Sequence, residues 1–300
     1  MPELPDIMVY LTALRNRLGN ARLERIMIRS PFLLRSFDPP LDSIDGARIT
    51  EISRMGKRLV FGFEGEAFLV LHLMIAGRLR WYDEPRTPAA RIELAALRFD
   101  TGSLVITEAG TKHRASLTLV SGRSALEALD PGGVEPLSAS YDEFSQAIRT
   151  SGHTLKRALT DPRIVSGVGN AYSDEILHTA RLSPVRRCSA LAEDDMRRLY
   201  DATVVTLTHW IETLRGEFGD RFPGAREITA FRPGFAVHGR FNEPCPICGA
   251  PVQRVVYAEN EMNYCPGCQT GGRILADRSL SRLLRDEWPR TLDELEHGRS

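Results

Sequence analysis

Two pairs of cysteines near the end of the chain constrain its fold more than any other feature. Cys245 and Cys248 bracket Pro-Ile, Cys265 and Cys268 bracket Pro-Gly, and sixteen residues separate the two pairs. Each Cys-x2-Cys turn presents two thiolates, and two such turns together offer four soft ligands in a tetrahedron. Disulfide bonds are the alternative, which a reducing compartment disfavours. The spacing therefore predicts one structural, non-catalytic zinc ion bound by all four cysteines.

Length and charge set wider bounds. The 300 residues are enough for two or three domains with their own cores. No apolar run reaches the roughly 18 residues of a membrane span, and the chain does not start with a basic segment followed by an apolar one. We therefore expect a cytoplasmic protein without a membrane partner. The net charge of +0 argues mildly against a nucleic-acid partner, but acidic surface elsewhere can offset a basic groove.

Hydrophobic periodicity separates helical from β-rich segments. Ile7, Leu11, Leu14 and Leu18 recur at helical spacing, and Gly19 ends that helix. Short apolar runs bounded by Gly, Asp or Pro then predict a two-sheet sandwich or barrel. From Tyr141 to about Arg215 the pattern is helical again. The β-type runs are 59–63, 67–73, 95–99 and 104–107.

The predicted fold class is multi-domain α+β. It combines an N-terminal two-sheet β-sandwich with flanking helices, a helical domain and a C-terminal zinc-ribbon hairpin. The Pro- and Gly-rich loop at 130–136 marks the first boundary. A short amphipathic helix in the charged tail would contain Leu280, Leu283, Leu284 and Trp288. The expected segments are the sandwich at 1–132, the helical domain at 137–235, the zinc finger at 236–270 and a charged extension at 271–300.

The chain begins Met1-Pro2-Glu3, and this start offers a nucleophile. Removal of Met1 would free the secondary amine of Pro2, and an α-amino group titrates near pH 8, so part of it is nucleophilic at neutral pH. Attack on a sugar C1′ would give a covalent iminium, and the Glu3 carboxyl is close enough for proton transfer. The alternative is that Pro2 only resists degradation and Glu3 is a surface charge.

A glycine-rich turn leads into a predicted helix at Gly167-Val168-Gly169-Asn170. Backbone N–H groups at such a turn can approach an anion, and the helix dipole favours negative charge there. Asn170, expected at the N-cap, can cap the helix or bind a phosphate. An ordinary tight turn is the alternative. Lys57, after Met55-Gly56, can bind phosphate, although a lone surface lysine is usually only solvated.

Taken together, these features resemble the formamidopyrimidine-DNA glycosylase and endonuclease VIII family of base-excision repair enzymes. The resemblance runs in order over about residues 1–270. The glycine turn and its helix resemble the family's helix–two-turn–helix. The matching motifs are Pro-Glu-Leu-Pro at the start, Met55-Gly56-Lys57, His72-Leu73 with Gly77, Glu135-Pro136-Leu137, Gly167 to Asn170, Asp174-Glu175-Ile176-Leu177, Val237-His238-Gly239-Arg240 and the two cysteine pairs.

The resemblance implies a bifunctional DNA glycosylase and AP lyase. It would act on oxidised or ring-opened bases and abasic sites in damaged double-stranded DNA, as a nucleoid-associated monomer. Pro2 would attack C1′ of a flipped nucleotide, Glu3 would handle protons at the sugar, and Lys57 would bind phosphate beside the lesion. Asn170 would bind phosphate from the helical domain, and Glu175 would support the site.

The chain departs from the family pattern at three DNA contacts. Ile75, preceded by Met74, stands where the family has a methionine wedge, although another apolar residue can still unstack bases. Lys112-His113-Arg114 replaces an Arg-Arg-Phe-Gly loop, and Asn260 replaces an arginine at the hairpin tip. The expected DNA contacts are His72, Met74, Ile75, Arg114, Gly167, Gly169, Asn170, Glu175 and Asn260.

These departures leave two alternatives open. One is a catalytically weak paralogue that binds damaged or abasic DNA without efficient base excision. The other is a lyase that acts only on abasic sites already formed.

Overall fold

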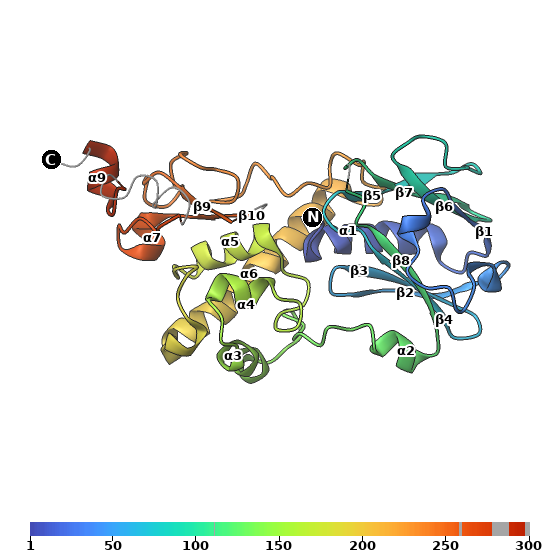
Figure 1. The fold of residues 1–300 in the computed structure, drawn as a ribbon, viewed down its shortest axis with the longest axis horizontal. Coiled ribbons are helices and arrows are strands. Elements are labelled where there is room, and N and C mark those ends of the chain that lie inside the picture. The colour runs from blue at the N-terminus through green and yellow to red at the C-terminus, as the bar shows by residue number, and fades with distance from the viewer. Residues whose placement is uncertain (111, 258–259, 278–287, 298–300) are drawn as a thin grey trace. The chain divides into compact units, whose positions relative to one another are not determined.

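The computed structural model of the chain describes residues 1–110, 112–257, 260–277 and 288–297 (Figure 1). It divides into two compact units. Unit 1 contains Met1–Pro131 and His209–Ala230, and unit 2 contains Gly132–Thr208 and Phe231–Ser300. The first division falls inside the loop 130–136. None of the helices in the described ranges is both long and apolar enough to cross a membrane.

Unit 1 contains two antiparallel four-stranded sheets, with strand orders β1-β6-β7-β5 and β2-β3-β4-β8. The two-sheet fold predicted for this part of the chain is therefore confirmed. Helix α1 spans Leu4–Leu18 and ends at Gly19, as the periodicity predicted. The remaining elements are β1 (Leu23–Ile28), β2 (Ile49–Met55), β3 (Arg58–Phe63), β4 (Ala67–His72), β5 (Gly77–Tyr82), β6 (Glu93–Phe99), β7 (Gly102–Glu108), β8 (Ser116–Ser121) and α2 (Arg123–Glu127).

The alternation of apolar residues along β3 explains how its sheet is covered. Leu59 and Phe61 belong to the main core, which also contains buried residues of α1 and of the other sheet. Val60 points to the opposite face, where it clusters with Phe68 and with Leu126 of α2. Because successive strand side chains face opposite sides, both faces of this sheet are buried.

The C-terminal part of α6 (Glu193–Phe218), from His209 onward, belongs to unit 1. Leu214 and Phe218 of this helix and Ile228 beyond it are fully or almost fully buried in the unit 1 core. The sequence assignment of 137–235 to one helical domain therefore differs from the structure at 209–230. The helical period continues without a break along α6, so periodicity alone does not reveal that its buried face contacts a different core.

Unit 2 consists of helices and a two-stranded hairpin. Helix α3 begins with a capping box between Ser140 and Glu143, and α5 packs against strand β10. Residues 236–277 and 288–297 also fall in this unit. Leu280, Leu283 and Leu284 lie outside the described residues. The elements are α3 (Tyr141–Thr150), α4 (Leu155–Thr160), α5 (Asn170–Thr179), α6 as far as Thr208, β9 (Gln253–Tyr257), β10 (Asn260–Tyr264), α7 (Pro266–Thr270) and α9 (Leu292–His297).

Candidate active site and metal centre

The start of the chain is buried against unit 1. Pro2 is buried, and Glu3 and Asp6 are 2% and 1% exposed. Glu3 is the N-cap residue of α1, and its backbone N–H donates to Asp6 Oδ2 at 2.9 Å. Two carboxyl groups are thus fixed close in sequence to the chain's amine. Both are buried, so Glu3 is not a surface charge.

Lys57 lies half-buried near these carboxyl groups. Burial lowers the pKa of the Lys57 ammonium, and the negative charge of Glu3 opposes that shift. Burial likewise lowers the pKa of the terminal amine of Met1, while Glu3 opposes the shift and Arg78 adds to it. A lowered pKa leaves more of an amine unprotonated and nucleophilic. Pro2, Glu3 and Lys57, predicted separately, thus gather at one charged and largely buried location, with Met1 still attached to Pro2.

His72, at the end of β4, has a buried Nε2 atom without a hydrogen-bond partner. Burial lowers the pKa of His72 to about 4, with the nearby cations Arg58 and Lys57 adding to the effect. The ring is therefore neutral at pH 7. A buried polar atom left unpaired is costly, and a bound ligand could satisfy it.

Residues 74–76 form the turn between β4 and β5. Met74 has φ +52°, and Ile75 is 50% exposed, so the apolar side chain expected to act as a wedge is presented to solvent. Gly77 closes this turn, since its N–H donates to the Leu73 carbonyl at 2.9 Å. A Cβ at Gly77 would lie 2.2 Å from that oxygen, so only glycine fits.

Arg114 lies in a loop fixed by a carboxylate that the sequence analysis overlooked. Glu108, at the end of β7, is 1% exposed. Its carboxylate accepts the backbone N–H groups of Arg114 at 3.0 Å and of Ala115 at 3.2 Å. Lys112, His113 and Arg114 are exposed on this loop. In the sequence, Glu108 directly follows a β-type run and precedes a short polar loop. That position was the signal that could have identified it as the residue that fixes the loop.

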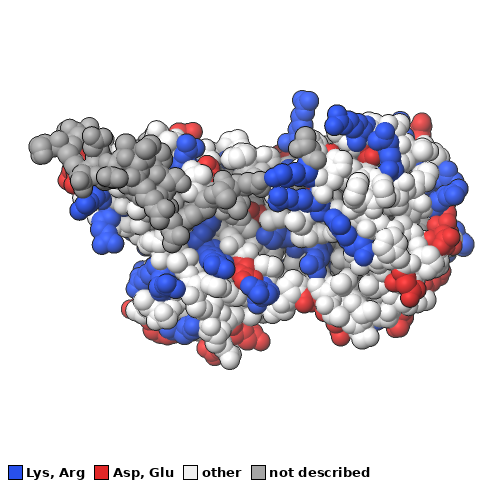
Figure 2. Space-filling view, viewed as in Figure 1, with Lys and Arg blue, Asp and Glu red and all other residues white. Residues whose placement is uncertain are grey.

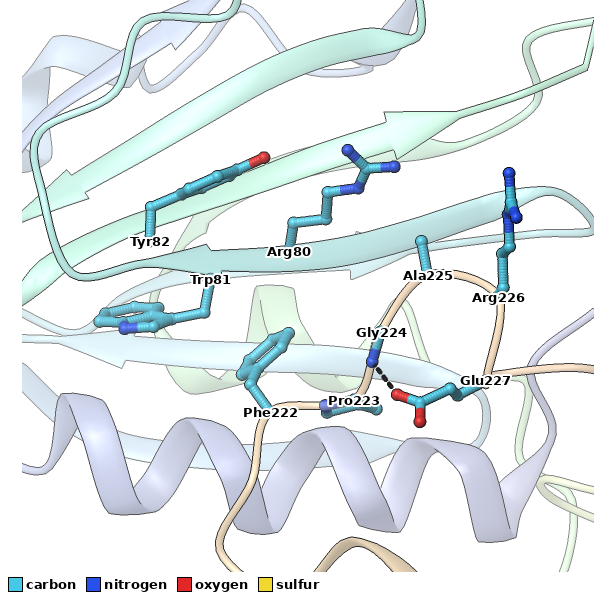
Figure 3. Close-up of a pocket in the computed structure, with 9 residues that line it drawn as sticks. All are labelled: Arg80, Trp81, Tyr82, Phe222, Pro223, Gly224, Ala225, Arg226 and Glu227. Carbon is cyan, nitrogen blue, oxygen red and sulfur yellow. Dashed lines mark hydrogen bonds between the residues drawn. The ribbon is translucent and has the colours of Figure 1, made fainter.

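Two connected clefts follow strand β5 in unit 1. The larger, of about 580 Å³, lies between Arg80, Trp81 and Tyr82 and the segment 222–227 (Figure 3). Arg80 and Tyr82 project from one face of β5, and Trp81 projects from the other. The second, of about 430 Å³, begins at Ile75 and shares Arg80 and Arg226 with the first. The surface beside the exposed Ile75 is therefore basic.

The charges on unit 1 are segregated. On the face shown in Figure 2, basic side chains gather toward the upper part of unit 1 and acidic ones toward its lower right. The zero net charge of the chain therefore conceals a basic region, as a phosphate-binding surface requires.

In unit 2, the glycine turn leads directly into α5. Gly167 has φ +78°, which favours glycine. The N-cap is Gly169 and α5 begins at Asn170, so the expectation of an Asn170 cap was wrong by one residue. The Asn170 side chain instead donates from Nδ2 to the backbone carbonyl of Glu261 at 2.6 Å. It thereby joins the start of α5 to strand β10.

Asp174 forms ion pairs and hydrogen bonds with three separate segments, which the sequence analysis did not predict. Its carboxylate pairs with Lys156 Nζ at 2.5 Å and with His238 Nδ1 at 2.8 Å. It also accepts the backbone N–H of Asn263 at 3.1 Å. The side chains of Asp174 and Lys156 are 0% and 12% exposed. The three partners come from segments far apart in the chain, so no local pattern reveals them.

Glu175 holds the segment that follows Gly234 and Phe235. Its carboxylate accepts the backbone N–H groups of Ala236 at 2.7 Å, Val237 at 3.0 Å and His238 at 2.9 Å. Burial raises the pKa of Glu175 in spite of these three donors. Its role inside unit 2 is therefore to fix the backbone that leads into the cysteine module. The side chain of Asn260 lies outside the described residues.

The four cysteines predicted to bind zinc lie close together. The Sγ atoms of Cys245 and Cys268 are 3.9 Å apart, and those of Cys248 and Cys265 are 3.3 Å apart. A tetrahedral zinc with Zn–S bonds of about 2.3 Å places its thiolates about 3.8 Å apart. The donor set thus fits a structural zinc site. Cys188, the fifth cysteine, is buried elsewhere.

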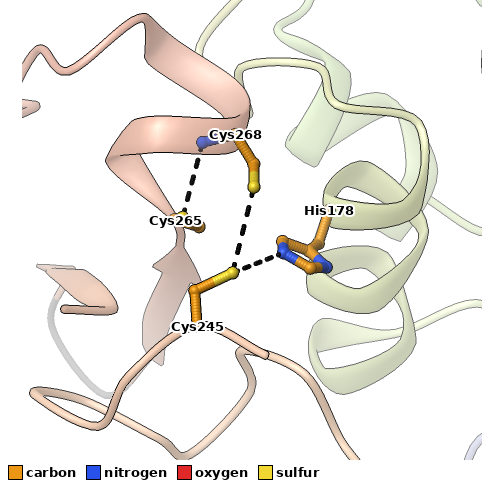
Figure 4. A group of neighbouring side chains, drawn as sticks. All are labelled: His178, Cys245, Cys265 and Cys268. Carbon is orange, nitrogen blue, oxygen red and sulfur yellow. Dashed lines mark hydrogen bonds between the residues drawn. The ribbon is translucent and has the colours of Figure 1, made fainter. Parts of the chain in front are cut away.

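A histidine joins this cluster from α5. The Nε2 atom of His178 lies 3.3 Å from Cys245 Sγ, and the ligand atoms of His178, Cys245, Cys265 and Cys268 lie within 4.8 Å of one another (Figure 4). His178 is 2% exposed. The sequence analysis missed it because 67 residues separate it from Cys245.

Comparison with known proteins gives a consistent result. The family model "Formamidopyrimidine-DNA glycosylase N-terminal domain" matches residues 1–113, and "Formamidopyrimidine-DNA glycosylase H2TH domain" matches residues 133–220. Formamidopyrimidine-DNA glycosylase of Thermus thermophilus is 35% identical over 283 residues, which cover 91% of this chain and 100% of that protein.

Two solved structures extend the likeness to the fold. A Lactococcus lactis FPG mutant in complex with Fapy-dG containing DNA is 26% identical, with a TM-score of 0.77, over 90% of this chain and 100% of that one. The Lactococcus lactis Fpg in complex with DNA that contains an abasic site is also 26% identical, with a TM-score of 0.76, over 89% of this chain and 99% of that one.

Proposed function

Because this chain belongs to the formamidopyrimidine-DNA glycosylase family, we propose that it is a bifunctional DNA glycosylase and AP lyase. It acts on oxidised or ring-opened bases and on abasic sites through a Schiff base at Pro2. The observation that carries this proposal is the cluster of buried Glu3 and Asp6 and half-buried Lys57 around the chain's amine. This arrangement provides a nucleophile, proton donors and a cation in one place.

The proposed reaction begins after removal of Met1, which frees the Pro2 nitrogen. Its lone pair forms a bond to C1′ of the flipped nucleotide while the C1′–base bond breaks and the base leaves with the bonding electrons. The base takes up the proton that the Pro2 nitrogen then loses, so the nitrogen regains a lone pair. Glu3 donates a proton to the sugar-ring oxygen as the ring opens, which leaves an iminium. Loss of a C2′ proton expels the 3′ phosphate, a second elimination expels the 5′ phosphate, and water hydrolyses the iminium.

Unit 1 supplies the contacts nearest the lesion in this proposal. Lys57 binds the phosphate beside it, and the unpaired Nε2 of His72 faces the same strand. Ile75, with Met74 behind it, enters the gap left by the flipped base, since exposed apolar residues can unstack a base step. Arg114 approaches the opposite strand from the loop that Glu108 fixes.

Unit 2 supplies phosphate contacts. The turn at Gly167 and Gly169 presents backbone N–H groups at the start of α5, where the helix dipole favours an anion. Asn170 contributes from the same position, and Glu175 supports the turn indirectly through the segment 236–238. Asn260, at the hairpin tip, contributes a neutral contact where the family has an arginine.

We propose that Cys245, Cys248, Cys265 and Cys268 hold one zinc ion. A bound zinc would cross-link the two cysteine turns and so stabilise a hairpin that is too small to have a large core. The buried residues near it in unit 2 are few, among them Val237 and Val252. The metal takes no part in bond breaking in this proposal.

One observation favours the alternative, a paralogue that binds damaged DNA without efficient base excision. Glu261 lies beside Asn170, which donates to its carbonyl, and the Glu261 carboxylate is partly exposed, 3.6 Å from Arg254. An acidic group next to a proposed phosphate site weakens binding, and the exposed Arg254 at this distance offsets only part of its charge.

Borohydride trapping separates these functions. The full chain is incubated with duplexes that carry an abasic site, an oxidised purine or an oxidised pyrimidine, after intact-mass analysis has shown whether Met1 is absent. We expect a trapped complex on all three, weakened by Pro2→Gly and, for base release, by Glu3→Gln. Glu212→Gln, an exposed change on α6, is the control. Trapping at full efficiency by protein that retains Met1 contradicts the role of Pro2, and binding without trapping supports the paralogue.

The salt dependence of DNA affinity tests the proposed DNA partner, and the mass in solution tests the proposed monomeric state. Affinity for a damaged duplex is expected to fall steeply as salt rises, because bound cations release counterions from phosphates. A flat dependence contradicts the phosphate contacts. Light scattering is expected to give the mass of one chain, since we propose a monomer.

A further inference from the structure

Helix α5 contacts the cysteine-containing part of unit 2 along its whole length. Near its start, Asn170 donates to the Glu261 carbonyl. One turn later Asp174 accepts from Asn263, and Glu175 accepts from His238. At the last turn His178 reaches Cys245. The helix that begins at the proposed phosphate site therefore ends at the proposed metal site.

The cysteine sulfurs also receive hydrogen bonds from donors near them. Cys265 accepts the backbone N–H of Cys268 at 3.4 Å. This donor comes from the cysteine turn itself. For Cys245 the structure provides the His178 ring, 3.3 Å away and buried. N–H donors to metal-bound groups orient them and tune the metal.

We propose that His178 is a positioning residue of the metal centre: it donates Nε2–H to the Cys245 thiolate and thereby couples zinc binding to helix α5. This inference rests on the zinc proposed above, but not on glycosylase activity. The proton must lie on Nε2 for this role, because a thiolate can only accept. The consequence is that metal occupancy stiffens the helix whose first residue is Asn170.

The number of thiol donors favours this role over direct ligation. The four thiols already form two close pairs, at 3.9 and 3.3 Å, and a structural zinc takes four ligands. A fifth donor group therefore belongs outside the coordination sphere. For His178 to be a ligand, a cysteine would have to give way, and Cys248 is the most exposed of the four.

The test compares zinc-loaded wild type with His178→Phe, which keeps a ring but removes the donor, and His178→Gln, which retains an N–H. His153→Phe, a histidine elsewhere in unit 2, is the matched control. Zinc content, the zinc dissociation constant from competition with a chromogenic chelator, and hydrogen exchange of the α5 amides are measured on full chains. Cobalt-substituted proteins report the number of thiolate ligands through their charge-transfer absorption.

We expect every protein to bind one metal with the same thiolate count. His178→Phe should bind zinc about 10- to 100-fold more weakly, with faster exchange in α5, and His178→Gln should recover part of both losses. Thermal unfolding of the zinc-loaded proteins shows whether a variant is folded. Unchanged zinc affinity in folded His178→Phe overturns the proposal. A second result would also overturn it: cobalt-loaded Cys248→Ser keeps the wild-type absorption spectrum, and the double variant Cys248→Ser/His178→Phe loses it. His178 would then be a metal ligand.

Discussion

The turn that carries Ile75 offers the sharpest mechanical test. In Gly77→Ala the new Cβ would lie 2.2 Å from the Leu73 carbonyl oxygen and 2.9 Å from the Leu73 carbonyl carbon and Cα. All three are backbone atoms, so no side chain can rotate away. Ordinary van der Waals contact begins at 3.4 Å. The two backbone segments must therefore separate by about 1.2 Å, the difference of these distances.

The cost follows from two effects. Separation breaks the Gly77 N–H bond to the Leu73 carbonyl, which contributes about 0.5–1.5 kcal/mol, and overpacking adds about 1–3 kcal/mol. We expect the free energy of unfolding to fall by about 3 kcal/mol, which for a unit of this size lowers Tm by about 6–12 °C. Since a displacement of about 1 Å can reduce a rate about 100-fold, base release on damaged DNA should fall by a factor of that order.

Calorimetry measures the change in Tm, and single-turnover base release measures the rate. Gly216→Ala is the matched control, because nothing lies within 4 Å of its Cβ, and alanine in a helix interior stabilises by about 0.5–1 kcal/mol. If Gly77→Ala melts like wild type and releases bases at the wild-type rate, the turn is not as tight as the structure has it.

Three further predictions concern buried polar groups. Lys156→Met should lower the free energy of unfolding by about 3–5 kcal/mol, because it leaves the buried Asp174 carboxylate without its cation; urea unfolding measures this. Because the pKa of His72 is about 4 in the folded protein, below its usual value of 6.5, its contribution to stability is intact above pH 6.5 and is lost as the pH falls toward 4. The free energy of unfolding of His72→Phe, relative to wild type, should therefore rise between pH 7 and 4.5. Glu108→Ala should leave the N–H groups of Arg114 and Ala115 without their acceptor, cost about 1–3 kcal/mol, and speed hydrogen exchange in that loop.

Local patterns predicted much of unit 1. The spacing from Ile7 to Leu18 and the glycine after it correspond to α1. The four β-type runs became β3, β4, β6 and β7 with shifts of one or two residues at their ends. These signals suffice because each depends on alternation or helical spacing within a few residues.

Features that depend on the folding of distant segments could not be predicted. Asp174 gathers Lys156, His238 and Asn263 from separate elements, and His178 reaches Cys245 only once α5 lies against the hairpin. The same limit applies to Glu108, whose partners lie on a loop without periodicity. Sequence motifs thus pointed to candidate site residues such as Pro2, Lys57 and the cysteines. The residues that position such groups, among them Glu108, Asp174 and His178, were found only in the structure.

The division of unit 1 along the chain has a consequence for synthesis on the ribosome. Its core includes Leu214, Phe218 and Ile228, so it cannot close when Pro131 has been translated. The ribosome must add a further 99 residues, from 131 to 230, which takes about 5–20 s at a synthesis rate of about 5–20 residues per second. During that interval the two sheets have an uncovered apolar surface, and the nascent chain is a natural client for a chaperone.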